Sequence, residues 1–88
     1  MNDLILKYKG IGALNVPPNG KLIYCLLSGY AEENGEIQIP VRTISQNLKI
    51  SRRAVTFNLH CLEKAGHIRI VPQYHSDGGR AANKYIVS

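Results

Sequence analysis

Residues 51–66 have the sequence SRRAVTFNLHCLEKAG, and this stretch decides the fold that we predict for the chain. Ser51 can cap a helix by accepting hydrogen bonds from the free amides of its first turn, and Gly66 can adopt the left-handed backbone that ends one. Val55, Leu59 and Leu62 follow one another at spacings of four and three residues, which places them on one helical face. The stretch therefore predicts a helix from 51 to 66 with a buried aliphatic face.

The opposite face of this helix is basic, polar and aromatic. Its side chains are, in chain order, Arg52, Arg53, Thr56, Phe57, His60 and Lys64. A helix that needed only to be soluble would not place Phe57 on this face. We interpret the stretch as a DNA-recognition helix.

The positive charge of the chain is concentrated in its second half. Residues 1–40 contain three Lys and four acidic residues, a net charge of −1, whereas residues 41–88 contain eight Lys and Arg and two acidic residues, a net charge of +6. This asymmetry indicates either a polyanionic partner on one face or a basic surface that only aids solubility. With 88 residues, the chain has room for one domain with one core.

Two further helices, three short strands and a hairpin loop are predicted around the recognition helix. We expect helices at 18–33 and 41–48, strands at 37–39, 67–71 and 84–87, a tight turn at 49–50 and a loop at 72–83. The helix at 18–33 has a broad apolar face, made of Leu22, Leu26 and Tyr30 and flanked by Ile23 and Leu27, which we expect to pack against two neighbouring elements. Residues 1–16 are predicted to be an N-terminal arm or short strand, and the two glycines among residues 9–16 argue against a firm element there.

This order of elements resembles the winged helix-turn-helix family. The resemblance is carried by ISRRAVTFNLHCLEKAGHIRI at 50–70 and DGGRAANKYIV at 77–87, and the order of elements extends it over residues 17–88. It implies an α+β domain with three helices and a small antiparallel β-sheet, made of a short strand and a C-terminal β-hairpin, the wing. The chain is most similar to the helix-turn-helix domains of bacterial and phage replication initiators and small transcriptional regulators, which often open with a Pro-x-x-Lys-x-x-Tyr helix like 18–24 here.

The resemblance implies that the helix at 51–66 enters the major groove of double-stranded DNA and that the wing at 72–83 contacts the adjacent backbone or minor groove. Arg52 and Arg53 can bind the edge of guanine or a phosphate, and Thr56 a phosphate or a thymine methyl group. The predicted DNA-binding residues are Arg42, Thr43, Ser51, Arg52, Arg53, Thr56, Phe57, His60, Arg80 and Lys84. Ser45 and Gln46 are further candidates for phosphate contacts, and Arg69 for a contact behind the wing.

Phe57 leaves three explanations open: packing on a thymine methyl group, a dimer contact, or binding of a protein partner. We therefore expect a transcriptional regulator or the DNA-binding part of a replication or mobile-element protein. The alternative is a protein-interaction module, such as an assembly factor or a phage-borne inhibitor, that binds through the Phe57 face. A palindromic DNA site would require a homodimer, and monomeric or tandem binding is equally open.

Other classes of protein are disfavoured by the pattern of reactive residues. Cys25 and Cys61 form no CxxC pair, which indicates reduced cysteines in a cytoplasmic protein, and no apolar run approaches the roughly 18 residues of a membrane span. His60, His67 and His75 lack the spacing of zinc ligands. The carboxylates suggest no catalytic set. We expect no enzyme activity, no metal, no cofactor and no membrane partner.

Overall fold

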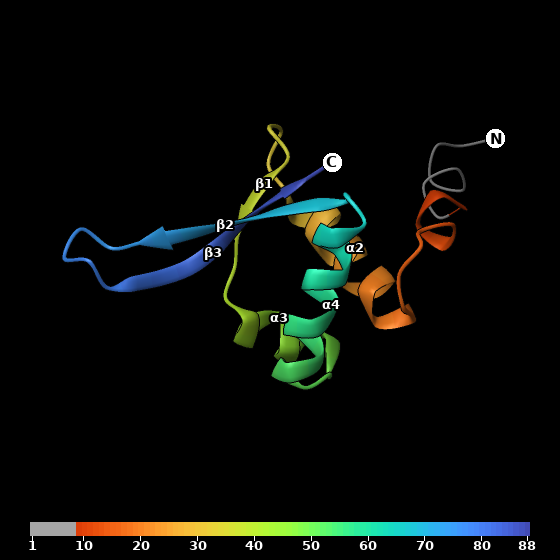
Figure 1. Cartoon of the computed structure of the whole chain (residues 1–88), viewed down its shortest axis with the longest axis horizontal. Helices are drawn as coiled ribbons and strands as arrows, with labels where there is room; N and C mark the ends of the chain where they lie inside the picture. Colours follow the sequence, from red (N-terminus) through yellow and green to blue (C-terminus); the bar gives the residue numbers. More distant parts are fainter. Residues whose placement is uncertain (1–8) are drawn as a thin grey trace.

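A three-stranded antiparallel sheet packs against helices in the computed structural model, which describes residues 9–88 (Figure 1). The elements are α2 (Pro18–Tyr30), β1 (Glu36–Gln38), α3 (Val41–Leu48), α4 (Arg52–Lys64), β2 (Ile68–Tyr74) and β3 (Arg80–Val87). The strand order is β1-β3-β2, so the last strand lies in the middle of the sheet. The predicted α+β class, with a sheet made of a short strand and a C-terminal hairpin, is confirmed.

A further helical segment precedes α2. Residues 9–12 are helical, and the amide of Ala13 donates to the carbonyl of Lys9 at 3.1 Å. The ammonium group of Lys21 donates to the carbonyl of Gly12 at 2.8 Å and ties this segment to α2. The expectation of no firm element at 9–16 is therefore wrong for residues 9–12, and the fold has one helical segment beyond the three helices predicted. The expected arm or strand at 1–8 lies outside the described residues.

Helix α2 ends at Tyr30, three residues before the predicted end at 33, because Ala31 is extended and turns the chain away. The helix buries only one edge of the broad apolar face predicted for it. Ile23 and Leu27 are fully buried, whereas Leu22 is 50% and Tyr30 75% exposed. The Ile23 and Leu27 edge of the predicted face therefore packs in the core, and the expectation that Leu22 and Tyr30 are buried is wrong.

The segment from α3 to α4 matches the sequence prediction closely. Helix α3 spans Val41–Leu48 as predicted, and Lys49 adopts the left-handed conformation, with φ 57° and ψ 42°, that turns the chain. The side chain of Ser51 then caps α4 by accepting from the amide of Ala54 at 3.1 Å. Gly66 follows the end of α4 with φ 84°, a left-handed conformation that glycine adopts without strain.

The core lies between the helices and the inner face of the sheet. Its buried apolar residues are Ile23, Leu27, Ile44, Val55, Leu59, Leu62, Ile68 and Tyr85. The three residues of α4 that were predicted to be core are among them, each exposed by 3% or less. Helices α2, α3 and α4 and strands β2 and β3 all contribute residues to this core. Helix α4 therefore packs against several elements, and its remaining face is directed toward solvent.

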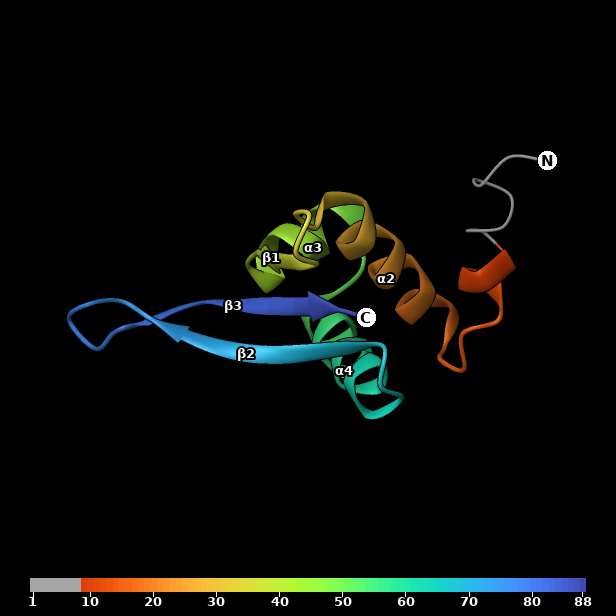
Figure 2. The ribbon, with the colours of Figure 1, turned by 90° about the horizontal axis from the view of Figure 1, so that it is seen from above.

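The C-terminal hairpin is longer than predicted. Strand β2 continues to Tyr74 and β3 begins at Arg80, so the predicted loop at 72–83 is wrong and the actual loop is 75–79. Pro72 does not end the strand because it lies at a register shift between Val71 and Gln73, where its missing amide breaks no ladder bond. Beyond the part paired with β1, the hairpin extends past the helices as a two-stranded ribbon (Figure 2).

Candidate nucleic-acid interface

The solvent face of α4 carries a stripe of four exposed side chains. Its members are Arg53, Phe57, His60 and Lys64. These positions follow one another at spacings of four, three and four residues, so they lie above one another on the side of the helix opposite the buried aliphatic residues. Phe57 is 61% exposed in the middle of this outer stripe. Because the opposite face of α4 is packed in the core, the helix holds the outer stripe in a fixed orientation toward solvent.

The flank of α4 beside the outer stripe faces the hairpin. Glu63 lies on this flank, where its Oε2 accepts from the backbone amide of Ile70 in β2 at 2.9 Å. Arg52 and Thr56 share the flank by helical spacing, and both are exposed. The two side chains therefore lie on the same side of α4 as Glu63, nearer to the N-terminal end of the helix.

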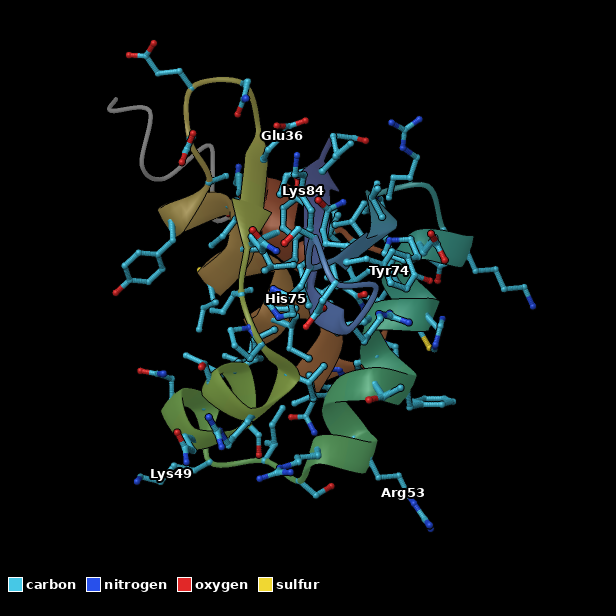
Figure 3. The ribbon with its side chains drawn as sticks, turned by 90° about the vertical axis from the view of Figure 1, so that its left-hand side faces the viewer. Glu36, Lys49, Arg53, Tyr74, His75 and Lys84 are labelled. Atoms are coloured by element: carbon cyan, nitrogen blue, oxygen red, sulfur yellow. The ribbon has the colours of Figure 1, made fainter. Side chains whose placement is uncertain are left out.

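Positive charge gathers at the end of the molecule where α3 turns into α4. Residues 37–62 contain no Asp or Glu but include Arg42, Lys49, Arg52 and Arg53, all four of which are exposed. Figure 3 shows Lys49 and Arg53 at one end of the molecule and Glu36 at the other. The acidic turn between α2 and β1 is thus kept away from the cationic end.

Helix α3 contributes less to this surface than the sequence predicted. Arg42 and Gln46 are exposed, but Thr43 is half-buried and lines an apolar cavity of about 370 Å³ together with Leu26 and Tyr30. The hydroxyl of Ser45 donates to the carbonyl of Ile50 within the turn. Ser45 therefore stabilises the path from α3 to α4, and its hydroxyl is already used inside the protein.

The hairpin presents an arginine stacked on an aromatic ring. Arg80 and Tyr74 are paired in register, and the guanidinium carbon of Arg80 lies 5.5 Å from the centre of the Tyr74 ring. Arg80 also donates to Oδ1 of Asn83. These contacts restrict the Arg80 side chain while leaving it exposed. Tyr74, 64% exposed, was missed as a site residue because the strand was predicted to end before it.

Lys84 lies apart from the other predicted site residues. Its ammonium group is 3.7 Å from Oε2 of Glu36, and both side chains lie at the end of the molecule opposite Arg53 (Figure 3). Tyr85, the next residue, points into the core, so strand alternation directs Lys84 to the outer face of the sheet. In the neighbouring strand β2, Val71 is paired with Lys84. Arg69 lies two residues before Val71, so it lies on the same outer face, and it is exposed.

The described residues contain no cluster of three or more His, Cys, Asp or Glu side chains that could hold a metal ion. Nor does any helix within 9–88 have the length and apolarity needed to cross a membrane.

The sequence matches no protein-family model and no curated protein.

Proposed function

We propose that this protein binds double-stranded DNA as a winged helix-turn-helix domain, with α4 in the major groove and the hairpin as the wing. The observation that carries the proposal is the acid-free run of residues 37–62, in which the exposed Lys49, Arg52 and Arg53 lie at the α3–α4 turn and the exposed Arg42 lies in the first turn of α3. A surface of one charge around an exposed helix complements the phosphates that line the major groove. The proposed role is a transcriptional regulator or the DNA-binding part of a replication or mobile-element protein.

Arg52 and Arg53 are placed to make the strongest contacts. They occupy the first turn of α4, where the unpaired backbone amides add partial positive charge. Among the described residues the one ion pair is that of Lys84 with Glu36, so neither guanidinium group is neutralised by an acid of this part of the chain. Each can therefore bind a phosphate, or donate two hydrogen bonds to O6 and N7 of guanine.

The wing supplies a second point of attachment. Arg80 projects on the part of the hairpin that extends beyond the helices, while its stacking on Tyr74 limits the conformational entropy that binding would cost. A phosphate contact from this position fixes the orientation of the domain on the duplex without selecting a sequence. The major groove would then be read by α4 alone.

The affinity for duplex DNA as a function of salt concentration tests this function. Each phosphate contact contributes a slope of about 0.9 in the logarithm of the binding constant against the logarithm of the salt concentration. We expect a steep decrease with salt on mixed-sequence duplexes and tighter binding to duplexes selected from a random pool. Absence of binding to any duplex at about 50 mM salt would overturn the proposal, because electrostatic attraction is then strong.

A charge-matched pair of variants locates the interface. The variants Arg53→Glu and Arg69→Glu each change the net charge by −2; Arg53→Glu should weaken duplex binding strongly, whereas Arg69→Glu, at an exposed position on the outer face of the sheet, should reduce it only slightly. Circular dichroism and thermal unfolding check that both variants stay folded. Equal losses in the two variants would mean that binding follows net charge and not the α4 surface.

The 61% exposure of Phe57 favours one second function, a protein-interaction module that keeps this fold. An assembly factor or an inhibitor would bury the Phe57 ring against a protein. On that function Phe57→Ala removes binding to the protein partner and leaves the affinity for DNA unchanged.

A further inference from the structure

We infer that Phe57 contacts the C5-methyl group of a thymine in the major groove, so that the protein prefers thymine at one fixed position of its binding site. The inference rests on the proposed DNA-binding function and adds a sequence preference to it. It starts from the place of Phe57 in the outer stripe, whose other members are polar or cationic.

The Phe57 ring has a cationic residue on either side along the helix. Arg53 precedes it by four residues and Lys64 follows it by seven, which at about 1.5 Å per residue corresponds to roughly 6 Å and 10 Å along the axis. All three side chains are exposed on one face. A partner that covers the ring must therefore be apolar at one point and anionic around it.

A duplex has this arrangement of groups, and an ordinary apolar protein surface does not. An apolar protein patch that covered the whole outer stripe would remove water from Arg53 and Lys64 without giving them partners, which is unfavourable for a charged group. In the major groove the phosphates border the base edges on both sides. The charge pattern around Phe57 thus favours DNA as the occupant of this face.

The ring selects one base. A phenyl group can neither donate nor accept a conventional hydrogen bond, so the donor and acceptor pattern of the bases gives it nothing to recognise. The C5-methyl group of thymine is the apolar group that the four bases present in the major groove. Phe57 is therefore a specificity-determining residue, while the arginines of the first turn of α4 supply most of the affinity.

Replacing thymine by uracil tests this contact, because the change removes one methyl group and keeps every phosphate and hydrogen-bonding group. The probe is a duplex selected by the wild-type protein from a random pool, with each thymine replaced in turn. At one position we expect the affinity of the wild-type protein to fall about fourfold, the ratio equivalent to the ~0.8 kcal/mol gained by burying one methyl group. Phe57→Ala should bind both duplexes equally.

Two controls separate the ring from its surroundings. Thr56→Ala removes a neighbouring methyl group on α4 at a predicted contact residue, so it should weaken binding to both duplexes alike and keep their fourfold ratio. At the same position, cytosine should bind more weakly than thymine, and 5-methylcytosine should recover part of the loss. Both results support the contact, and loss of the discrimination in Thr56→Ala instead of Phe57→Ala would overturn it.

The failure of this inference is distinguishable from the failure of the proposed function. If the wild-type protein binds selected duplexes but no uracil replacement changes its affinity, DNA binding stands and the thymine contact is overturned. If Phe57→Ala keeps both the affinity and the response to uracil, the ring serves another partner and the inference is again overturned. If no duplex is bound at low salt, the proposed function fails and the inference fails with it.

Discussion

Gly20 of α2 faces Asn58 of α4 with little room for a side chain between the two helices. A Cβ atom on Gly20 would lie 3.3 Å from Oδ1 of Asn58 and 3.1 Å from Cγ2 of Val16. Asn58 is 4% exposed, and its Nδ2 donates to the carbonyl of Ala54 at 2.8 Å, which fixes the direction of the amide. The missing side chain of Gly20 therefore allows a polar residue to sit between α2 and the helix that carries the candidate interface.

Gly20→Ala should lower the free energy of unfolding by about 1 kcal/mol. The added methyl group overpacks the contact, which costs about 1–3 kcal/mol. The higher helix propensity of alanine offsets about 1 kcal/mol of this cost. Gly29→Ala is the matched control, because Gly29 lies in the same helix and a Cβ there would have no neighbour within 4 Å. That variant should raise the free energy of unfolding by about 0.5–1 kcal/mol. Urea denaturation measures both, and an equal gain in the two variants would contradict the close packing.

Tyr85→Phe should leave the protein as stable or make it more stable by about 1 kcal/mol, because a buried group without a hydrogen bond costs about 1–3 kcal/mol. Tyr85 is fully buried, and no hydrogen bond of ordinary geometry reaches its hydroxyl. Asn83 is close enough to affect the hydroxyl, but its Oδ1 already accepts from Arg80. A loss of stability above about 1 kcal/mol in urea denaturation would mean that the hydroxyl has a partner.

The same hydroxyl should make stability depend on alkaline pH. Burial raises the pKa of Tyr85 above its usual value of 10.0, and the nearby Asn83 and Arg80 side chains oppose the shift in part. Because the folded-state pKa is the higher one, this contribution is complete below the unfolded pKa and is lost as pH rises through the folded one. The stability of the wild type relative to Tyr85→Phe should therefore decrease above about pH 10. A difference that stays constant with pH would contradict this.

Arg80→Ala and Lys84→Ala should separate the two basic residues of β3. On the proposed function, Arg80→Ala reduces the salt slope of DNA binding by about 0.9, the value for one phosphate contact. Lys84→Ala leaves the slope unchanged, because Lys84 pairs with Glu36 on the outer face of the sheet. Loss of that half-exposed pair should change stability by at most about 1 kcal/mol. A larger effect of Lys84 on the slope would place the DNA on the opposite side of the hairpin.

The parts of the fold that the sequence predicts are those with local signals. The limits of α3, the Ser51 cap and the buried face of α4 follow from residues within a few positions of one another. Which part of the broad apolar face of α2 is buried could not be predicted in this way. Both the stripe of Leu22 and Tyr30 and the stripe of Ile23 and Leu27 fit a helical period. The choice between them depends on where α4 packs, a contact between residues far apart in the chain.

The residues of the candidate site also fall into two groups, those that local sequence signals predict and those that depend on tertiary pairing. The exposed residues of α4 follow from its buried face, since the two lie on opposite sides of one helix. The placement of Lys84 depends on the pairing of β1 with β3, which sets Lys84 opposite Gln38 and close to Glu36. Tyr74 was missed because Pro72 suggests the end of a strand unless the register shift beside it is known. Sequence reasoning therefore located the helix of the site but not the residues that tertiary pairing adds or removes.

Lys49→Gly should make the protein more stable and, on the proposed function, weaken its binding to DNA. Lys49 is the one non-glycine residue within 9–88 that has a positive φ. A left-handed conformation costs such a residue about 1–2 kcal/mol, which glycine avoids. Glycine, however, loses more conformational entropy on folding, which costs about 0.5–1 kcal/mol. The net gain should be about 0.5–1 kcal/mol, measured by urea denaturation.

The change also removes an exposed cation at the end of the molecule that carries Arg53 (Figure 3). The salt slope of DNA binding should therefore fall by up to about 0.9. Lys49→Asn separates the two effects, because asparagine removes the charge but tolerates the left-handed region less well than glycine. It should match Lys49→Gly in the loss of slope and fall short of it in stability. A more stable Lys49→Gly variant with an unchanged slope would mean that Lys49 lies outside the DNA contact, and that its strained backbone serves only the turn between α3 and α4.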